Sequence, residues 1–161
     1  MVKLYDDKFI EFKKSDTEIK YDIKGKWLIF FSDFAYADKL CKDLVDNDIV
    51  LEANHSIGGT SGVCRIFVDA KNLEQHRKVL RYLIDNQHIP RTKKGNHLYN
   101  IAFKLQLQTD RLEYYGWDFE NLLSLCDLVD LKTGKFLDVN NSVFDRIDKY
   151  LKPKKSKKRK K

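Results

Sequence analysis

The chain has 161 residues, of which 31 are Lys or Arg and 24 are Asp or Glu, and its formal net charge is +7. Eight of the basic residues lie in 152–161, which contains no acid, so 1–151 holds 23 basic against 24 acidic groups and carries a net charge of −1. A hydrophobic content of 42% argues against global disorder, and the longest apolar run, Trp27–Phe31, is far too short for a membrane span.

The N-terminal part of the chain predicts an arm, a strand and a helix. Residues 1–12 lack the apolar core and the cleavage site of a secretory signal. Residues 8–24 mix short apolar runs with charge and indicate an arm with room for a strand. Trp27–Phe31 is typical of a buried strand. Ser32 and Asp33 are suitable N-cap residues for a helix that ends near Asp46.

A hairpin follows that helix. Ile49–Ser56 returns to a strand pattern, and Val63–Asp69 predicts a second strand. The glycine-rich residues 58–62 between them are the strongest turn signal in the chain. We therefore expect two antiparallel strands joined by a tip at 58–62.

The next two predicted elements complete the core of the fold. Asn72 or Asp69 can cap a helix whose apolar stripe runs through 73–84. Leu98–Leu105 then predicts a strand. The order from Trp27 onwards is strand–helix–strand–strand–helix–strand, which indicates an α+β fold with an antiparallel sheet and both helices on one of its faces.

The C-terminal third predicts less regular structure. Residues 106–116 indicate a polar loop, and a short helical stretch is expected near 119–126. A capped helix is expected from about Asn141 to Leu151, and Pro153 ends it. We thus expect one globular domain over 1–151 and a disordered basic tail over 152–161.

Because side chains alternate between the two faces of a strand, the sequence predicts which of them lie on the face of the sheet that the helices do not cover. If Cys64, Ile66 and Val68 of the second hairpin strand pack on the helices, Arg65 and Phe67 lie on the open face. In the last strand the inward positions are Tyr99, Ile101 and Phe103, and the outward ones are Asn100, Ala102 and Lys104. An open face with Arg65, Phe67 and Lys104 suits an anionic, planar ligand. The alternative is a face covered by the N-terminal arm or the C-terminal segment.

The densest group of polar residues follows the last of these strands, in 104–116. Lys104 and Arg111 suit phosphate, and Tyr114 or Tyr115 suits stacking. The expected ligand-binding residues, with one from the first hairpin strand, are Arg65, Lys104, Thr109, Arg111, Tyr114, Tyr115 and His55. Glu113 is a possible acid or base, and a solvated loop is the alternative interpretation.

Several familiar sites are not predicted. The second hairpin strand lacks the aromatic residues of an RNA-recognition motif. His76 lies on the apolar stripe of a helix, so we expect it to be a partly buried histidine with its hydrogen bonds satisfied. The four histidines and three widely spaced cysteines fit neither a metal site nor a disulfide framework. We expect a reduced, cytoplasmic protein with no cofactor, no metal and no membrane partner.

The basic tail predicts contact with a polyanion. Lysine and arginine side chains bind a phosphate backbone by releasing its counterions. The residues expected to make this contact are Lys154, Lys155, Lys157, Lys158, Arg159, Lys160 and Lys161. The same segment would serve as a nuclear localisation signal in a eukaryote, or only as a solubilising end.

The middle of the chain resembles a known family. The residues that carry the resemblance are 25–30, 63–69, Phe103-Lys104, Thr109 and Tyr115-Gly116. Together they resemble the basophilic leukaemia-expressed protein family, which has the fold of translation initiation factor 4E. The resemblance covers about residues 24–116.

This resemblance implies a curved antiparallel sheet backed by helices, with an RNA or nucleotide-like ligand on the concave face. The sequence departs from the family pattern at Gln106, where an acid is expected, and at Leu112, where a glycine is expected. Cap binding uses two tryptophans around a methylated base, whereas this chain has Trp27 in an apolar strand and Trp117. A literal cap-binding role is not expected.

Three functions follow as hypotheses. The first is a non-enzymatic binding protein for nucleic acid, with RNA as the expected partner, or for a nucleotide or other phosphate-bearing ligand. The second is a phosphoryl-group enzyme, a phosphoesterase or a phosphothreonine-lyase-like protein, that uses the 104–115 cluster with Lys104 or His55 as base. The third is a protein-interaction module, such as a host-directed or anti-defence protein.

Overall fold

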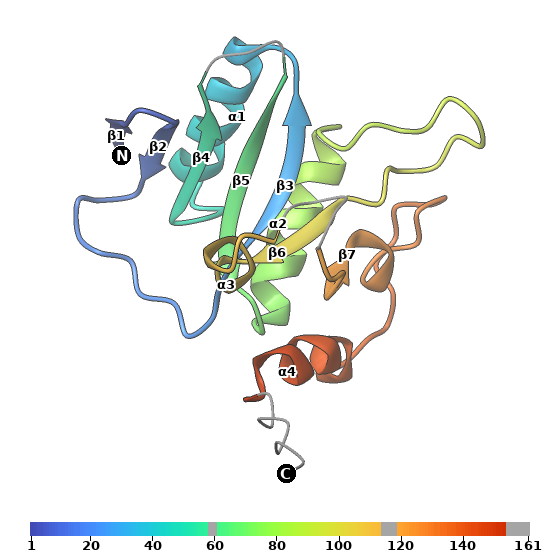
Figure 1. The fold of residues 1–161 in the computed structure, drawn as a ribbon. Coiled ribbons are helices and arrows are strands. Elements are labelled where there is room, and N and C mark those ends of the chain that lie inside the picture. The colour runs from blue at the N-terminus through green and yellow to red at the C-terminus, as the bar shows by residue number, and fades with distance from the viewer. Residues whose placement is uncertain (58–60, 114–118, 154–161) are drawn as a thin grey trace.

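A computed structural model describes residues 1–57, 61–113 and 119–153, and its described strands form one seven-stranded antiparallel sheet (Figure 1). The order across the sheet is β1-β2-β4-β5-β3-β6-β7. The strands are β1 (Val2–Tyr5), β2 (Phe9–Lys13), β3 (Lys24–Phe31), β4 (Glu52–Ser56), β5 (Gly62–Asp69), β6 (Ala102–Leu105) and β7 (Leu123–Ser124). The α+β class with an antiparallel sheet is therefore confirmed.

Two long helices, α1 (Phe34–Asp46) and α2 (Leu73–Asp85), pack against one face of the sheet (Figure 1). Their starts are fixed by side-chain caps, because Asp33 accepts a hydrogen bond from the backbone N of Ala35 and Asn72 accepts one from that of Gln75. Both helices were predicted, and of the two possible caps for the second helix the structure uses Asn72. The carboxylate of Asp69 instead accepts two backbone N–H groups of the N-terminal arm.

The core of the sheet has the predicted connectivity. The elements β3, α1, β4, β5, α2 and β6 follow one another along the chain, and β4, β5, β3 and β6 are neighbours in the sheet. This is the split βαβ arrangement. The predicted hairpin is present as β4 and β5, whose register places Asn54 opposite Arg65 and His55 opposite Cys64. The middle of its expected tip, 58–60, lies outside the described residues.

Both edges of the sheet carry strands beyond this core. β1 and β2 extend the β4 edge. β2 lies in the expected arm, 8–24, where the sequence pattern indicated room for a strand, whereas β1 lies before the arm and was not predicted. A turn connects them in which the Asp6 carboxylate accepts the backbone N–H groups of Lys8 and Phe9. β7 pairs with β6 at the opposite edge.

The strand predicted over 98–105 is wrong in its first half, because only Ala102–Leu105 pairs with β3 and β7. The backbone N of Leu98 donates to the carbonyl of Leu131, and that of Tyr99 donates to the carbonyl of Pro90. These bonds take the segment away from the sheet, so Tyr99 is half exposed where an inward position was expected. Phe103 points into the core as predicted.

The C-terminal third also differs in part. The short helical stretch expected near 119–126 is present only at its end, as the 3₁₀ helix η1 (Leu125–Asp127), and β7 precedes it. The segment expected to be a loop after β6 contains a short helix, α3 (Gln106–Asp110), on the face of the sheet opposite α1 and α2. The last predicted helix is present as the 3₁₀ turn η2 (Asn141–Phe144) followed by α4 (Asp145–Leu151).

The core lies between the sheet and the two long helices, and buried cysteines and a histidine belong to it. Cys41 and Cys64 are unpaired thiols within it, and the hydrogen bond from Cys64 together with burial raises the pKa of the Cys41 thiol. His76 is also fully buried. Of the helices in the described ranges, none is long and apolar enough to cross a membrane.

Gly25 allows the closest approach between β3 and this core. A Cβ atom at this position would lie 2.2 Å from Cζ of Phe103, which is fully buried. Gly25→Ala is therefore expected to lower the free energy of unfolding by about 1–3 kcal/mol, measured by urea denaturation. The loss should be smaller in the Phe103→Leu background, where the side chain is shorter, and an equal loss in both backgrounds would contradict this explanation.

Candidate functional site

In the described part of the chain, the three neighbouring strands β3, β5 and β6 carry four cations on the open face of the sheet, the face that α1 and α2 do not cover. Lys24 and Lys26 come from β3, Arg65 from β5 and Lys104 from β6. Their strands are neighbours, and the register places Lys26 opposite Lys104 on one side and opposite Phe67 on the other. Because side chains alternate along a strand, all of these residues leave the sheet on the same face. We call Lys24, Lys26, Arg65, Lys104 and Phe67 the sheet-face cluster.

Phe67 is the centre of the sheet-face cluster. Its ring centroid lies 4.4 Å from Nζ of Lys24, 5.9 Å from Nζ of Lys26 and 5.8 Å from Cζ of Arg65. Arg65 is also 3.6 Å from the centroid of the Phe9 ring, on β2. Such distances allow cation–π attraction. Cations grouped around aromatic rings suit a ligand that has both an anionic group and a planar ring.

Lys26 is the most unusual of the four cations because its side chain is almost completely buried, at 1% exposure. Its Nζ donates to Oε1 of Gln106 at 3.1 Å and to Oγ1 of Thr109 at 2.7 Å, both from α3. Neither acceptor is charged, and within the described ranges Lys26 makes no salt bridge. Burial, and then the positive charges of Arg65 and Lys104, lower the pKa of the Lys26 amine to about 7.

The other cations have partial counter-charges. Lys24 forms a salt bridge of 3.2 Å with the buried carboxylate of Glu52, on β4. Nε of Arg65 donates to Oδ1 of Asn54 at 2.7 Å, and burial lowers the pKa of Arg65 while the nearby charge of Glu11 opposes this shift. Burial also lowers the pKa of Lys104. The positive charges on the open face are thus only partly neutralised by acidic groups, and their side chains are packed together instead of being surrounded by water.

Part of this face is covered. Helix α3 lies across one end of β3 and β6, as Figure 1 shows, and its Gln106 and Thr109 hold Lys26. Lys104 lies 5.8 Å from the ring centroid of Phe119, at the start of the last described segment. The expected alternative was a cover by the N-terminal arm or the C-terminal segment, whereas the end of this face at Lys26 is covered by α3.

The structure brings together three of the predicted ligand-binding residues. Arg65 and Lys104 belong to the sheet-face cluster, and Thr109 joins them through Lys26. The recorded partner of Arg111 is outside the cluster, since its guanidinium lies 5.1 Å from the ring centroid of Tyr150 on α4. Two other predicted positions, Tyr114 and Tyr115, and the basic tail from Lys154 onwards lie outside the described residues.

His55 is on the opposite face of the sheet. Its Nε2 lies 3.1 Å from Oδ1 of Asp38 on α1, its Nδ1 lies 3.0 Å from the carbonyl O of Ser56, and its side chain is fully buried. Asp38 also pairs with Lys3 of β1 at 2.9 Å. This chain of contacts joins β1, α1 and β4. Lys104 and His55, the two residues considered as a base, therefore do not share a site.

His76 is the satisfied core histidine that the sequence predicted. Nε1 of Trp27 donates to its Nδ1 at 3.0 Å, so its Nε2 carries the proton and donates to the carbonyl O of Ala70 at 2.7 Å. Burial lowers the pKa of His76 to about 4. It was expected to be partly buried, and the structure buries it fully.

Sequence reasoning missed Lys24, Lys26 and Phe9 as parts of the site. The predicted strand began at Trp27, whereas β3 begins at Lys24. Had the strand been extended back to Lys24, alternation with the inward Trp27 would have placed both lysines on the open face. No local signal indicates that Lys26 is buried, because its partners lie 80 and 83 positions further along the chain.

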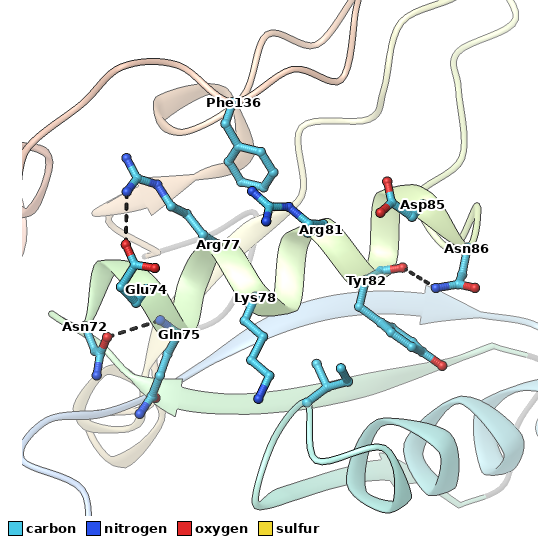
Figure 2. Close-up of a pocket in the computed structure, with 11 residues that line it drawn as sticks. Asn72, Glu74, Gln75, Arg77, Lys78, Arg81, Tyr82, Asp85, Asn86 and Phe136 are labelled. Carbon is cyan, nitrogen blue, oxygen red and sulfur yellow. Dashed lines mark hydrogen bonds and ion pairs between the residues drawn. The ribbon is translucent and has the colours of Figure 1, made fainter.

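A second polar surface lies on the outer side of α2 (Figure 2). It is a wide hollow of about 860 Å³ whose cations already have partners. Arg77 pairs with Glu74, Lys78 donates to the carbonyl O of Asp48, and Arg81 lies over the ring of Phe136 at 5.2 Å. Figure 2 shows these side chains spread along both flanks of the helix and not directed at one point. The sheet-face cluster is the better candidate for a site.

Comparisons of the chain with protein-family models, with curated proteins and with solved structures find no match. The described residues also contain no group of three or more His, Cys, Asp and Glu side chains that could hold a metal ion.

Proposed function

We propose that this chain is a non-enzymatic nucleic-acid- or nucleotide-binding protein, with RNA as the expected partner, that holds phosphate groups at the sheet-face cluster. The observation that carries the proposal is the gathering of four cations on three neighbouring strands, three of them around the ring of Phe67, where Lys26 is buried without a salt bridge to any described residue. Burying like charges together costs free energy of folding, and groups perturbed in this way are concentrated at functional sites. A phosphate group would supply the missing negative charge.

The chemistry of the accessible members supports the same partner. Arg65 and Lys24 are only partly buried, and their side chains offer N–H donors to phosphate oxygens. Phe9, which is partly exposed under the Arg65 guanidinium, offers an aromatic surface for a base. The basic tail would add sequence-independent affinity by counterion release.

The proposal includes the finer fold assignment, an initiation-factor-4E-like sheet with its ligand on the concave face. A seven-stranded antiparallel sheet with helices behind it supports this assignment. Because one fold hosts many functions, the proposed function rests on the cluster and not on the fold.

Binding to a single-stranded RNA oligonucleotide, followed by fluorescence anisotropy, tests the proposal. We expect the logarithm of the affinity to fall linearly with that of the salt concentration, by about 0.7 per phosphate contact. Deleting 152–161 should reduce this slope. Arg65→Ala should weaken binding by a further tenfold or more, because a charge-assisted hydrogen bond contributes about 1.5–3 kcal/mol. Arg81→Ala, which removes a cation behind the sheet, is the matched control.

The enzyme and protein-interaction hypotheses predict different results from these binding experiments. Absent or salt-insensitive RNA binding would remove the present proposal. Turnover of nucleotides or phosphopeptides that Lys104→Ala abolishes in a folded chain would favour a phosphoryl-group enzyme. A stable protein that co-purifies with the chain, with no RNA binding, would favour an interaction module.

A further inference from the structure

We propose that ligand binding at the sheet-face cluster is coupled to the uptake of one proton by Lys26. This inference rests on the proposed function, since it concerns how the same site is regulated. It predicts that the affinity for a phosphate-bearing ligand falls as the pH rises above neutrality, although the phosphodiester groups of RNA keep their charge throughout that range.

The hydrogen bonds of Lys26 are compatible with either protonation state. A neutral amine has two N–H groups, which are enough for Oε1 of Gln106 and Oγ1 of Thr109. A protonated amine has a third N–H and a positive charge. Both acceptors are neutral and the amine is shielded from water, so that charge has no salt-bridge partner among the described residues.

The charges around Lys26 favour the neutral form. Arg65 of β5, Lys104 of β6 and Lys24 of β3 itself all oppose its protonation, and Asp110 of α3 is the acid that favours it. Glu52 of β4 acts mainly on Lys24, with which it is paired. Burial and the three cations together bring the pKa of Lys26 to about 7, so the free protein holds the amine largely neutral at pH 8.

A phosphate group bound to Lys24 and Arg65 would favour the protonated form of Lys26 without contacting its amine. All three cations lie within 6 Å of the centroid of the same Phe67 ring, so a bound anion is also close to the buried amine. Its negative charge offsets the repulsion from Arg65 and Lys24 and makes protonation favourable. The proton comes from the solvent, and no covalent bond forms or breaks.

Isothermal titration calorimetry with the full-length chain at pH 8 tests the coupling. The probe is a single-stranded RNA oligonucleotide without terminal phosphates, titrated in buffers of low and high ionisation enthalpy. The dependence of the measured enthalpy on the buffer gives the number of protons bound. We expect about 0.9 proton per chain, and an affinity that falls by up to tenfold per pH unit above pH 7.

Two substitutions at Lys26 separate charge from proton exchange. Lys26→Arg carries a permanent charge, so binding should persist, with no proton uptake and no dependence on pH. Lys26→Met carries no charge, so binding should be weaker and also without uptake. Lys78→Met, on the outer side of α2, should behave like the unchanged protein.

The possible failures are distinguishable. RNA binding without proton uptake, or uptake that persists in both Lys26 variants, would overturn the coupling and leave the proposed function intact. The absence of any RNA binding would overturn the proposed function and the coupling with it.

Discussion

Lys26→Met is expected to stabilise the folded protein at pH 6.5, with an increase in the free energy of unfolding of about 1–4 kcal/mol. Lys26 is buried, and its pKa is lowered from 10.5 to about 7. Between these two values the unfolded chain binds a proton that the folded chain does not, so stability rises with pH over this range. The full destabilisation is present below about pH 7, and it fades as the pH approaches 10.5.

Methionine is a suitable replacement because it has a similar length and no charge to bury. Gln106 and Thr109 lose a donor, but both are only partly buried and water can replace it. Urea denaturation at pH 6.5 and at pH 9.5 gives the measurement, and the gain should be larger at the lower pH. Lys78→Met should change stability by only a few tenths of a kcal/mol. A stability loss in Lys26→Met at pH 6.5 would contradict the description of Lys26 as an uncompensated buried amine.

A stabilising substitution at this position would also bear on function. Residues that act on a ligand are often not those that best stabilise the fold. The same Lys26→Met variant is expected to bind RNA more weakly. Greater stability together with weaker binding is the combination that distinguishes a functional lysine from one that only supports the packing of α3.

His76 is expected to dominate the loss of stability in acid. Its pKa is about 4 in the folded protein and about 6.5 in an unfolded chain. As the pH falls from 6.5 to 4, the unfolded chain binds a proton that the folded chain excludes, so the stability associated with neutral His76 is progressively lost. A difference of 2.5 pKa units corresponds to about 3 kcal/mol.

The structural reason is that both nitrogens of the ring are already in use. Protonation would place a hydrogen on Nδ1, where the indole N–H of Trp27 already donates, inside a fully buried cluster. The measurement is the free energy of unfolding in urea from pH 7 to pH 4. His76→Gln should be less stable at pH 7 but should show a shallower pH dependence, whereas His97→Gln serves as a control. An unchanged slope in His76→Gln would contradict this assignment.

The long helices and the core strands could be predicted because their signals are local. The caps at Asp33 and Asn72 and the apolar stripe of α2 lie within a few residues of the structures they specify. β1 was missed because it has only four residues and an exposed end at Leu4 and Tyr5. The segment 98–101 has the pattern of a strand, but its backbone bonds go to distant loops, which no local pattern shows.

The candidate site was predictable only in part for the same reason. Strand alternation correctly placed Arg65 and Lys104 on one face. Placing His55 required the register of the hairpin, which sets it opposite the inward Cys64. The state of Lys26 depends on α3, which folds back over the sheet from about 80 residues further along the chain.

The most direct test of the central claim is to map RNA binding on the ¹⁵N-labelled chain by nuclear magnetic resonance, which suits a protein of 19.1 kDa. Adding the oligonucleotide should shift the backbone amide signals of Lys24 to Leu28, of Arg65 to Phe67 and of Lys104 to Thr109, with little change along α2. The same shifts should persist when 152–161 is deleted, at a higher RNA concentration. Shifts confined to the tail, or centred on Arg77 to Arg81, would show that the sheet-face cluster is not the binding site.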